Sequence, residues 1–483
     1  MNTFKSFFKD TAVYGLASVL PKVIVIGLVA IHTEVFKTVE FSFMTTWYVY
    51  AAFINIILTL GLETSFFRFY TAESDKKMVI STSFTLLLIS SLTLLFAGYL
   101  FSGSLCDFFG FNDDRYLSLL LWITVLDTLS VIPFAYLRVI NKSFRFLIIK
   151  LSNVITLAFF TVFFLIILPK YEPATTFLHS LNLIPAGYKP QVLHIFIANL
   201  FASFITLVLL LPELGKMTIS IDRVLLKKLM HYGIPIMIGG IAYAVNEHLD
   251  KLMIPALIDE NANGIYAACY KLGVFMTLYI TAFRMGAEPF FFNNAHLSDA
   301  KEKYSTIMIS FVTFGSMTML LVIVLIDPIS HLFIRQHIYL EGLYIVPVIL
   351  LANLFSGVYA NLSVWYKLTD QTRFGMYISI FGGVLTIISL LILIPPFGIS
   401  GAAYATLFTY LSMAVISWYF GSRYYSIPYD IPKIMLIIGT GAMLSLLSFH
   451  FFRGHYLINI IICTSYMIFL YLLLKKEIRQ ILS

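Results

Sequence analysis

Residues 374–394 read FGMYISIFGGVLTIISLLILI, a run of 21 residues without one Asp, Glu, Lys or Arg. A helix rises 1.5 Å per residue, so about 20 apolar residues cross the roughly 30 Å hydrocarbon layer of a bilayer. Similar runs recur from one end of the chain to the other. The pattern predicts a polytopic membrane protein.

The composition of the 483-residue chain leads to the same expectation. Hydrophobic residues make up 59% and charged residues 12%, and the mean hydropathy is +0.89. Soluble domains carry about 25% charged residues, and a soluble chain of this length would have too few charges to cover its surface. The composition therefore excludes a soluble enzyme, a nucleic-acid-binding protein and a disordered scaffold.

Fourteen apolar windows are long enough to span a membrane. Alternating apolar and polar decamers, typical of a membrane β-barrel, are absent, so we expect an all-α fold. The first window follows Lys5 and Lys9 and is expected to be a retained helix, not a signal peptide. The expected spans are 11–31, 41–62, 78–101, 117–137, 147–168, 191–211, 232–258, 264–287, 304–326, 343–365, 374–394, 399–420, 431–450 and 456–474.

Basic residues are distributed unequally between alternate loops. One set of loops, which includes both termini, holds 22 Lys and Arg residues, and the opposite set holds 6. Because basic loops stay on the cytoplasmic side, we expect both termini in the cytoplasm. An even number of spans agrees with this orientation.

Two short motifs recur along the chain. Tyr14-Gly15 recurs as Tyr232-Gly233, and Phe144-Arg145-Phe146 resembles Thr372-Arg373-Phe374, at offsets of 218 and 228. Parallel repeats of this kind are a transporter architecture with substrate held between the halves. We therefore expect a six-helix bundle at 1–211, a basic cytoplasmic linker at 212–231, a second six-helix bundle at 232–420 and two extra helices at 421–483.

Four basic residues lie inside the expected spans: Lys22, Lys251, Lys271 and Arg284. A charge there costs at least about 2.5–3.5 kcal/mol, so it usually faces a cavity or a partner. Lys22 lies roughly 16 Å into the first span and either lines a polar lumen or pairs with Asp127. Arg284 either lines the same lumen or extends to the cytoplasmic interface. Lys22, Lys271 and Arg284 together would suit a phosphate.

Intramembrane carboxylates are the second group of candidates. Glu247 and Lys251 are spaced to pair on one helix face, with Asp250 beside them, among glycines and prolines that interrupt the seventh span. This segment predicts either a site for a coupling H⁺ or Na⁺ or a solvated outer end. Asp127 forms an ion pair or serves ion coupling. The cysteine and histidine spacing indicates no metal site, and no resident cofactor is expected.

Several punctuating motifs resemble polysaccharide-unit flippases of O-antigen, capsule and exopolysaccharide synthesis. These flippases belong to the multidrug/oligosaccharidyl-lipid/polysaccharide exporter superfamily. In the first half the motifs are Tyr14-Gly15, Pro21-Lys22, Glu40-Phe41, Gly61-Leu62-Glu63 and Arg68-Phe69. In the second half they are Tyr232-Gly233-Ile234-Pro235, Asp250-Lys251 and Gly264-Ile265-Tyr266.

The resemblance implies two bundles around a central cavity that opens alternately to each side of a bacterial inner membrane. It implies a polyprenyl-pyrophosphate-linked oligosaccharide as substrate, moved to the periplasmic leaflet without covalent chemistry. Lys22 and Arg284 would meet the pyrophosphate, although Lys at 22 weakens bidentate recognition, and Lys271 and Arg68 are further substrate-binding candidates. Membrane lipids, a polysaccharide polymerase and glycosyltransferases would be the partners, and no nucleic acid.

Three alternatives remain open. A peptidoglycan-precursor flippase has the same number of spans and the same cationic lining. A multidrug/cation antiporter would favour acidic and aromatic lining, which Lys22 opposes. A membrane polysaccharide polymerase would need a large outer loop with paired carboxylates, and the longest one, 169–190, contains none. Asp113-Asp114 is expected to cap a helix or to lie in a solvated turn, not to bind a metal.

Overall fold

The computed structural model describes residues 2–171 and 188–482, apart from His296, Asp370 and Thr372. All regular secondary structure within these residues is helical. Fourteen helical stretches are long and apolar enough to cross a membrane, which confirms the expected all-α fold and number of spans. Residues 172–187 of the longest outer loop lie outside the described part of the chain.

The chain divides into two compact units, Met1–Ala244 and Val245–Ser483, hereafter the first unit and the second unit. The expected division into two bundles, a linker and two extra helices stays a prediction. The helices of the first unit are α1 (Asn2–Val35), α2 (Thr38–Thr59), α3 (Leu62–Ala72), α4 (Lys76–Leu100), α5 (Ser102–Phe109), α6 (Asp114–Val139), α7 (Ser143–Val162), η1 (Phe163–Ile167), α8 (Leu168–Lys170), α10 (Val192–Leu209), α11 (Leu211–Leu214) and most of α12 (Arg223–His248).

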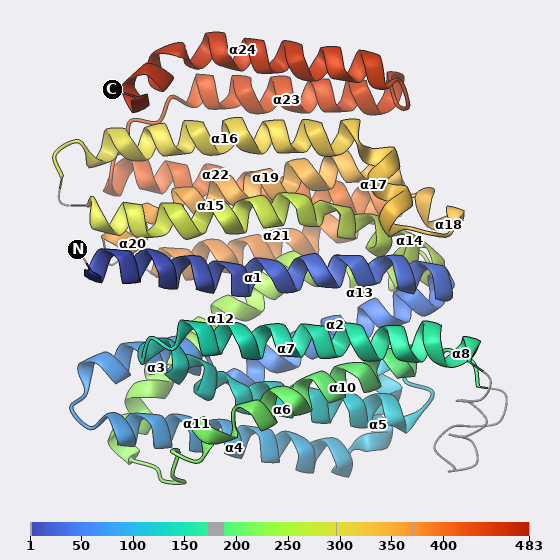
Figure 1. Cartoon of the computed structure of the whole chain (residues 1–483), viewed down its shortest axis with the longest axis vertical. Helices are drawn as coiled ribbons and strands as arrows, with labels where there is room; N and C mark the ends of the chain where they lie inside the picture. The colour runs from blue at the N-terminus through green and yellow to red at the C-terminus, as the bar shows by residue number, and fades with distance from the viewer. Residues whose placement is uncertain (1, 172–187, 296, 370, 372, 483) are drawn as a thin grey trace. The chain divides into compact units, whose positions relative to one another are not determined.

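The second unit contains the remaining helices. They are α13 (Asp250–Leu257), α14 (Glu260–Tyr270), η2 (Lys271–Gly273), α15 (Val274–Asn293), α16 (Ala300–Val324), α17 (Ile326–Phe333), α18 (His337–Leu340), η3 (Leu343–Ile345), α19 (Val346–Leu362), α20 (Val364–Leu368), α21 (Arg373–Phe397), α22 (Ile399–Tyr424), α23 (Ile431–Phe451) and α24 (Tyr456–Leu482). The last two, α23 and α24, lie side by side and pack on α16 (Figure 1).

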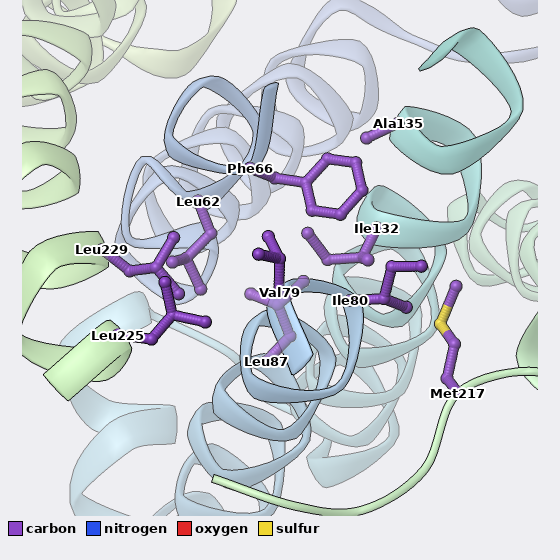
Figure 2. Packing of buried hydrophobic residues seen from close by; sticks show 10 residues of the cluster. All are labelled: Leu62, Phe66, Val79, Ile80, Leu87, Ile132, Ala135, Met217, Leu225 and Leu229. Atoms are coloured by element: carbon purple, nitrogen blue, oxygen red, sulfur yellow. The ribbon is translucent and has the colours of Figure 1, made fainter. Parts of the chain in front are cut away.

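An apolar cluster joins α3, α4 and α6 of the first unit to the start of α12. Its side chains are Leu62, Phe66, Val79, Ile80, Leu87, Ile132, Ala135, Met217, Leu225 and Leu229 (Figure 2). Leu225 and Leu229 fall within the expected linker, yet they are buried here. The end of the expected linker is therefore the first part of α12, and burial of its apolar side chains holds it against α3, α4 and α6.

Several expected spans contain breaks. The second span is divided between α2 and α3, because Leu60 and Gly61 both have positive φ angles of 51° and 65°. The seventh ends at His248, and α13 begins after one intervening residue. The eighth expected span is built from α14, the short η2 turn and α15.

Of the acidic pair before the fourth span, Asp113 caps the helix and Asp114 is its first residue. The Asp113 carboxylate accepts a hydrogen bond from the backbone N–H of Arg115 at 2.9 Å, which satisfies an orphan donor at the start of α6. The Arg115 guanidinium, hydrogen-bonded to the same carboxylate, lowers the pKa of Asp113.

Candidate functional site

A cluster of one carboxylate and two cations joins α15 to α20 in the second unit. Glu288 Oε1 lies 2.8 Å from Arg284 Nη2 and 3.0 Å from Lys367 Nζ. All three side chains are between 31% and 46% exposed, and they line a small cleft together with Asn361. Two cations share one carboxylate, so the cluster keeps a net positive charge where a ligand can reach it.

Lys271 lies in the η2 turn between α14 and α15, and its side chain is exposed. It forms no ion pair with any carboxylate in the part of the chain that the structure describes. Arg284 follows thirteen residues later, so the two cations stand roughly 20 Å apart along this helical span. The structure therefore does not gather Lys271 and Arg284 at one point.

Lys22 lies in α1 of the first unit, one residue after Pro21, and its side chain is exposed. The α1 helix continues through Pro21 to Val35. Among the described residues, Asp127 makes no ion pair with Lys22. That Lys22 lines a polar lumen stays a prediction.

Arg68 stacks on an aromatic ring near the end of the second span. Its guanidinium carbon lies 4.4 Å from the centre of the Tyr232 ring, which joins α3 to α12. Glu63, on the same short helix, instead pairs with Arg138 at 2.9 Å. Cation–π contacts at exposed sites contribute about 0.5–1 kcal/mol, so this contact already gives Arg68 a structural role.

The glycines beside these residues bring two backbone segments into close contact. A Cβ on Gly233 would lie 2.5 Å from the carbonyl oxygen of Leu60, and a Cβ on Gly61 would clash with the Gly233 carbonyl. Ser65 Oγ donates to the carbonyl oxygens of Gly61 and Leu229 at 3.2 and 3.3 Å. Two sequence motifs that lie 172 positions apart therefore touch, which only the tertiary structure reveals.

The most buried charges of the second unit surround the break between α12 and α13. Lys251 Nζ lies 2.8 and 3.1 Å from the two Asp250 carboxylate oxygens, and these side chains are only 8% and 4% exposed. The Tyr266 hydroxyl donates to Asp250 at 2.6 Å. Helical spacing would also allow an ion pair between Glu247 and Lys251. In the structure, however, Lys251 Nζ contacts Glu247 through its backbone carbonyl oxygen, at 3.0 Å.

The Glu247 carboxylate is consequently held by phenols. Tyr410 donates to Oε2 at 2.8 Å, and the Tyr270 hydroxyl lies 3.5 Å from Oε1. The residue before Glu247, the buried Asn246, accepts a hydrogen bond from Thr386 at 3.0 Å. The segment is thus a packed polar network inside the second unit, because Asn246, Asp250 and Lys251 are buried and not solvated.

A separate carboxylate lies within the first unit. Asp127 of α6 accepts a hydrogen bond from the Ser203 hydroxyl of α10 at 2.7 Å. The Lys150 ammonium influences it electrostatically from α7, but lies 4.3 Å from the centre of the Phe134 ring. Asp127 is therefore held by a neutral donor, with a cation nearby and no direct ion pair among the described residues.

The sequence named most of the charged members of these sites but few of their partners. Ser203 and Tyr410 are ordinary residues of apolar spans, and no local pattern marks them as partners of Asp127 and Glu247. Tyr266, the partner of Asp250, belongs to the Gly264-Ile265-Tyr266 motif, and this motif was the signal that could have identified it. No group of three or more His, Cys, Asp or Glu residues that could hold a metal ion occurs in the described ranges.

Comparison with known proteins places these observations in a family. Residues 7–295 match the family described as polysaccharide biosynthesis protein. An uncharacterized membrane protein of Methanocaldococcus jannaschii is 27% identical over 192 residues, which are 39% of this chain and 44% of that protein. The match with that curated relative thus spans less than half of its length.

Solved structures share the architecture at low sequence identity. The lipid II flippase MurJ, in an inward closed conformation, has a TM-score of 0.69 at 17% identity, with 96% of this chain and 99% of that chain covered. An inward-facing multidrug resistance MATE family transporter of the MOP superfamily has a TM-score of 0.63 at 12% identity, with 89% and 96% covered. The chain belongs to the polysaccharide biosynthesis protein family, and its fold is that of MurJ and the MATE transporters.

Proposed function

We propose that this protein flips polyprenyl-pyrophosphate-linked oligosaccharide units from the cytoplasmic to the periplasmic leaflet by alternating access. The observation that carries the proposal is the Arg284 cluster, where the two exposed cations Arg284 and Lys367 share the single carboxylate of Glu288. Lys271, on the same helical span as Arg284, is a further exposed cation. Membership of the polysaccharide biosynthesis family supports a saccharide-bearing substrate.

The chemistry of such a substrate fits these side chains. A saccharide diphosphate head cannot cross hydrocarbon, and the polyprenyl chain does not leave it, so a polar path beside lipid lets each part stay in its own medium. The Arg284 guanidinium can contact two phosphate oxygens, and an ammonium such as Lys22 or Lys271 acts as a point charge. Glu288, which competes for Arg284, would keep the contact weak enough for release.

Energy coupling belongs to the carboxylates that no cation neutralises directly. Asp250 is engaged by Lys251, so it serves as a structural ion pair. Asp127 and Glu247 are held by hydroxyl groups, and either can take up H⁺ or Na⁺ during the cycle. Transport measured with imposed proton and sodium gradients, in Asp127→Asn and Glu247→Gln variants, tests this assignment.

The proposed setting is a bacterial inner membrane, with both termini in the cytoplasm. A polysaccharide polymerase outside and glycosyltransferases inside would consume and supply the lipid-linked units. Accessibility of single cysteines placed in the loop that contains Lys76 and in the loop that contains Arg453 to a membrane-impermeant thiol reagent tests the orientation. Labelling of the Lys76 loop from outside intact cells would contradict it.

Mass spectrometry of polyprenyl-pyrophosphate lipids in a strain lacking the gene tests the function. Accumulated lipid-linked oligosaccharide together with loss of surface polysaccharide is the expected result, and the accumulated mass identifies the saccharide. Accumulation of the peptidoglycan precursor would assign the chain to that pathway. Single units still reaching the surface would indicate a polymerase, and unchanged lipids and polymer would leave the multidrug/cation antiporter.

A further inference from the structure

A groove of about 840 Å³ lies between α15 and α16 in the second unit. Its inner wall is apolar and consists of Ala282, Phe283, Gly286, Ala287, Phe290 and Ile307. Its other end is charged, because Asp299, Glu302 and Lys303 line it at the start of α16. The groove adjoins the cleft of the Arg284 cluster, because Ala287 lines both.

The groove is graded in polarity along the membrane-spanning direction. From Glu302 to Ser310 the α16 helix rises about 12 Å. The hydroxyl groups of Thr306 and Ser310 donate to the carbonyl oxygens of Glu302 and Thr306, at 3.1 and 3.0 Å. Their donors are therefore used within the helix, and the wall beyond the charged end is suited to hydrocarbon.

The charged end has an acidic surplus. Lys303 pairs with Asp299 at 2.9 Å. Glu302 forms no ion pair with any residue that the structure describes, and its side chain is exposed. Two carboxylates and one ammonium give this end a net negative charge, opposite to the Arg284 cluster. An anionic lipid or a polyprenyl diphosphate would meet repulsion here.

We propose that this groove binds a membrane phospholipid whose head group carries a primary ammonium beside its phosphate, with an acyl chain along the apolar wall. Glu302 accepts the ammonium, Lys303 contacts the phosphate, and Phe283, Phe290 and Ile307 pack against the chain. The proposal depends on no assumption about the transported saccharide.

Two variants test the two halves of this site, each with a matched control. Glu302→Gln removes the unpaired carboxylate, and Glu341→Gln removes an exposed carboxylate elsewhere in the second unit. Gly286→Leu fills the groove, because a Cβ at Gly286 meets no atom within 4 Å. Gly439→Leu makes the same change at an equally open position in α23, so any helix-propensity gain is shared.

Native mass spectrometry of the purified full chain is the measurement. The probes are dioleoyl phosphatidylethanolamine, phosphatidylcholine and phosphatidylglycerol, and undecaprenyl diphosphate serves as competitor. We expect phosphatidylethanolamine to bind about fivefold more tightly than phosphatidylglycerol, the size of one interfacial charge contact. Glu302→Gln should abolish the preference, and Gly286→Leu should weaken binding of all three phospholipids. Both control variants should bind as the parent does, with unchanged elution on size exclusion.

Three results would overturn the proposal. Equal or tighter binding of phosphatidylglycerol would exclude recognition of the ammonium. Equal phospholipid binding by the Gly286→Leu and Gly439→Leu variants would exclude the groove as the site. Displacement of phosphatidylethanolamine by undecaprenyl diphosphate in the parent but not in Gly286→Leu would assign the groove to the substrate tail instead.

Discussion

Two carboxylates within membrane-spanning segments, one in each unit, are held in different ways. In the second unit, the Asp250 carboxylate lies 2.8 Å from the Lys251 ammonium and both side chains are nearly inaccessible. In the first unit, the Asp127 carboxylate lies 2.7 Å from a Ser203 hydroxyl, and the backbone of Leu60 closely contacts Gly233 within α12. A charge partner holds Asp250, whereas a neutral hydrogen bond holds Asp127.

This difference separates structural charges from those available to a ligand. A buried ion pair repays its desolvation only while both partners are present. The exposed Arg284, which shares Glu288 with Lys367, can exchange partners at little cost in folding. Substitutions at these positions should therefore affect different measurements.

The largest effect is expected at the buried pair. Asp250→Ala leaves the Lys251 ammonium buried without its counter-ion and should lower the free energy of unfolding by about 3–5 kcal/mol. Asp250→Leu combined with Lys251→Met should recover most of the loss, because it removes both charges. Thermal unfolding of both variants in detergent, monitored by size-exclusion chromatography of the heated samples, measures the loss and the recovery. A stable Asp250→Ala protein would contradict the structural role of the pair.

Arg284 should affect transport more than folding. Arg284→Ala should lower binding of the lipid-linked pyrophosphate about tenfold or more, as expected for lost hydrogen bonds to a charged group. The free energy of unfolding of this variant should change by less than about 1 kcal/mol, because the ion pair that it loses is exposed. Arg423→Ala removes another exposed cation of the second unit and is the control. Equal binding by both variants would remove Arg284 from the substrate site.

The close contact between Leu60 and Gly233 in the first unit gives the next test, which is a change in stability. Gly233→Ala places a methyl group against the Leu60 carbonyl oxygen and should cost about 1–3 kcal/mol of stability, as overpacking does. Gly27→Ala, at a position in α1 where a Cβ meets no atom within 4 Å, gives the same helix-propensity gain without the clash. The two unfolding temperatures should move in opposite directions. A Gly233→Ala protein as stable as Gly27→Ala would show that the segments are not in contact.

A small effect on stability is also expected at Asp127. Asparagine retains an oxygen that can accept the Ser203 hydrogen bond, so Asp127→Asn should change the free energy of unfolding by about 1 kcal/mol or less. Export measured in the same variant tests the coupling role. Destabilisation comparable to that of Asp250→Ala would mean that Asp127 depends on a direct charge partner after all.

Much of the architecture was accessible from local pattern. Apolar runs such as 374–394 predicted the all-α fold and the number of spans, because crossing hydrocarbon requires helices that satisfy their own backbone groups. The capping role of Asp113 was also readable, since it depends on residues two positions apart. Glycines and prolines indicated an interruption of the seventh span, but the break at Leu60 was not readable, because window hydropathy carries no information on backbone angles.

In the candidate site, too, the sequence located charged residues but did not determine their partners. Hydropathy located Lys22, Lys271 and Arg284, since a cation within an apolar run stands out in any single sequence. Spacing allowed Lys251 to pair with Glu247 or with the adjacent Asp250, and the structure pairs it with Asp250, a choice that spacing alone does not decide.

The sequence by itself determined that the chain lies in a membrane, how many times it can cross, and which charges lie within apolar spans. These properties depend on composition within about 20 consecutive residues. Only the tertiary structure decided which charges neutralise one another, that Gly61 meets Gly233, and that α15 and α16 form a groove with one acidic end. Those outcomes depend on contacts between residues distant along the chain, or on side-chain and backbone angles that composition does not constrain.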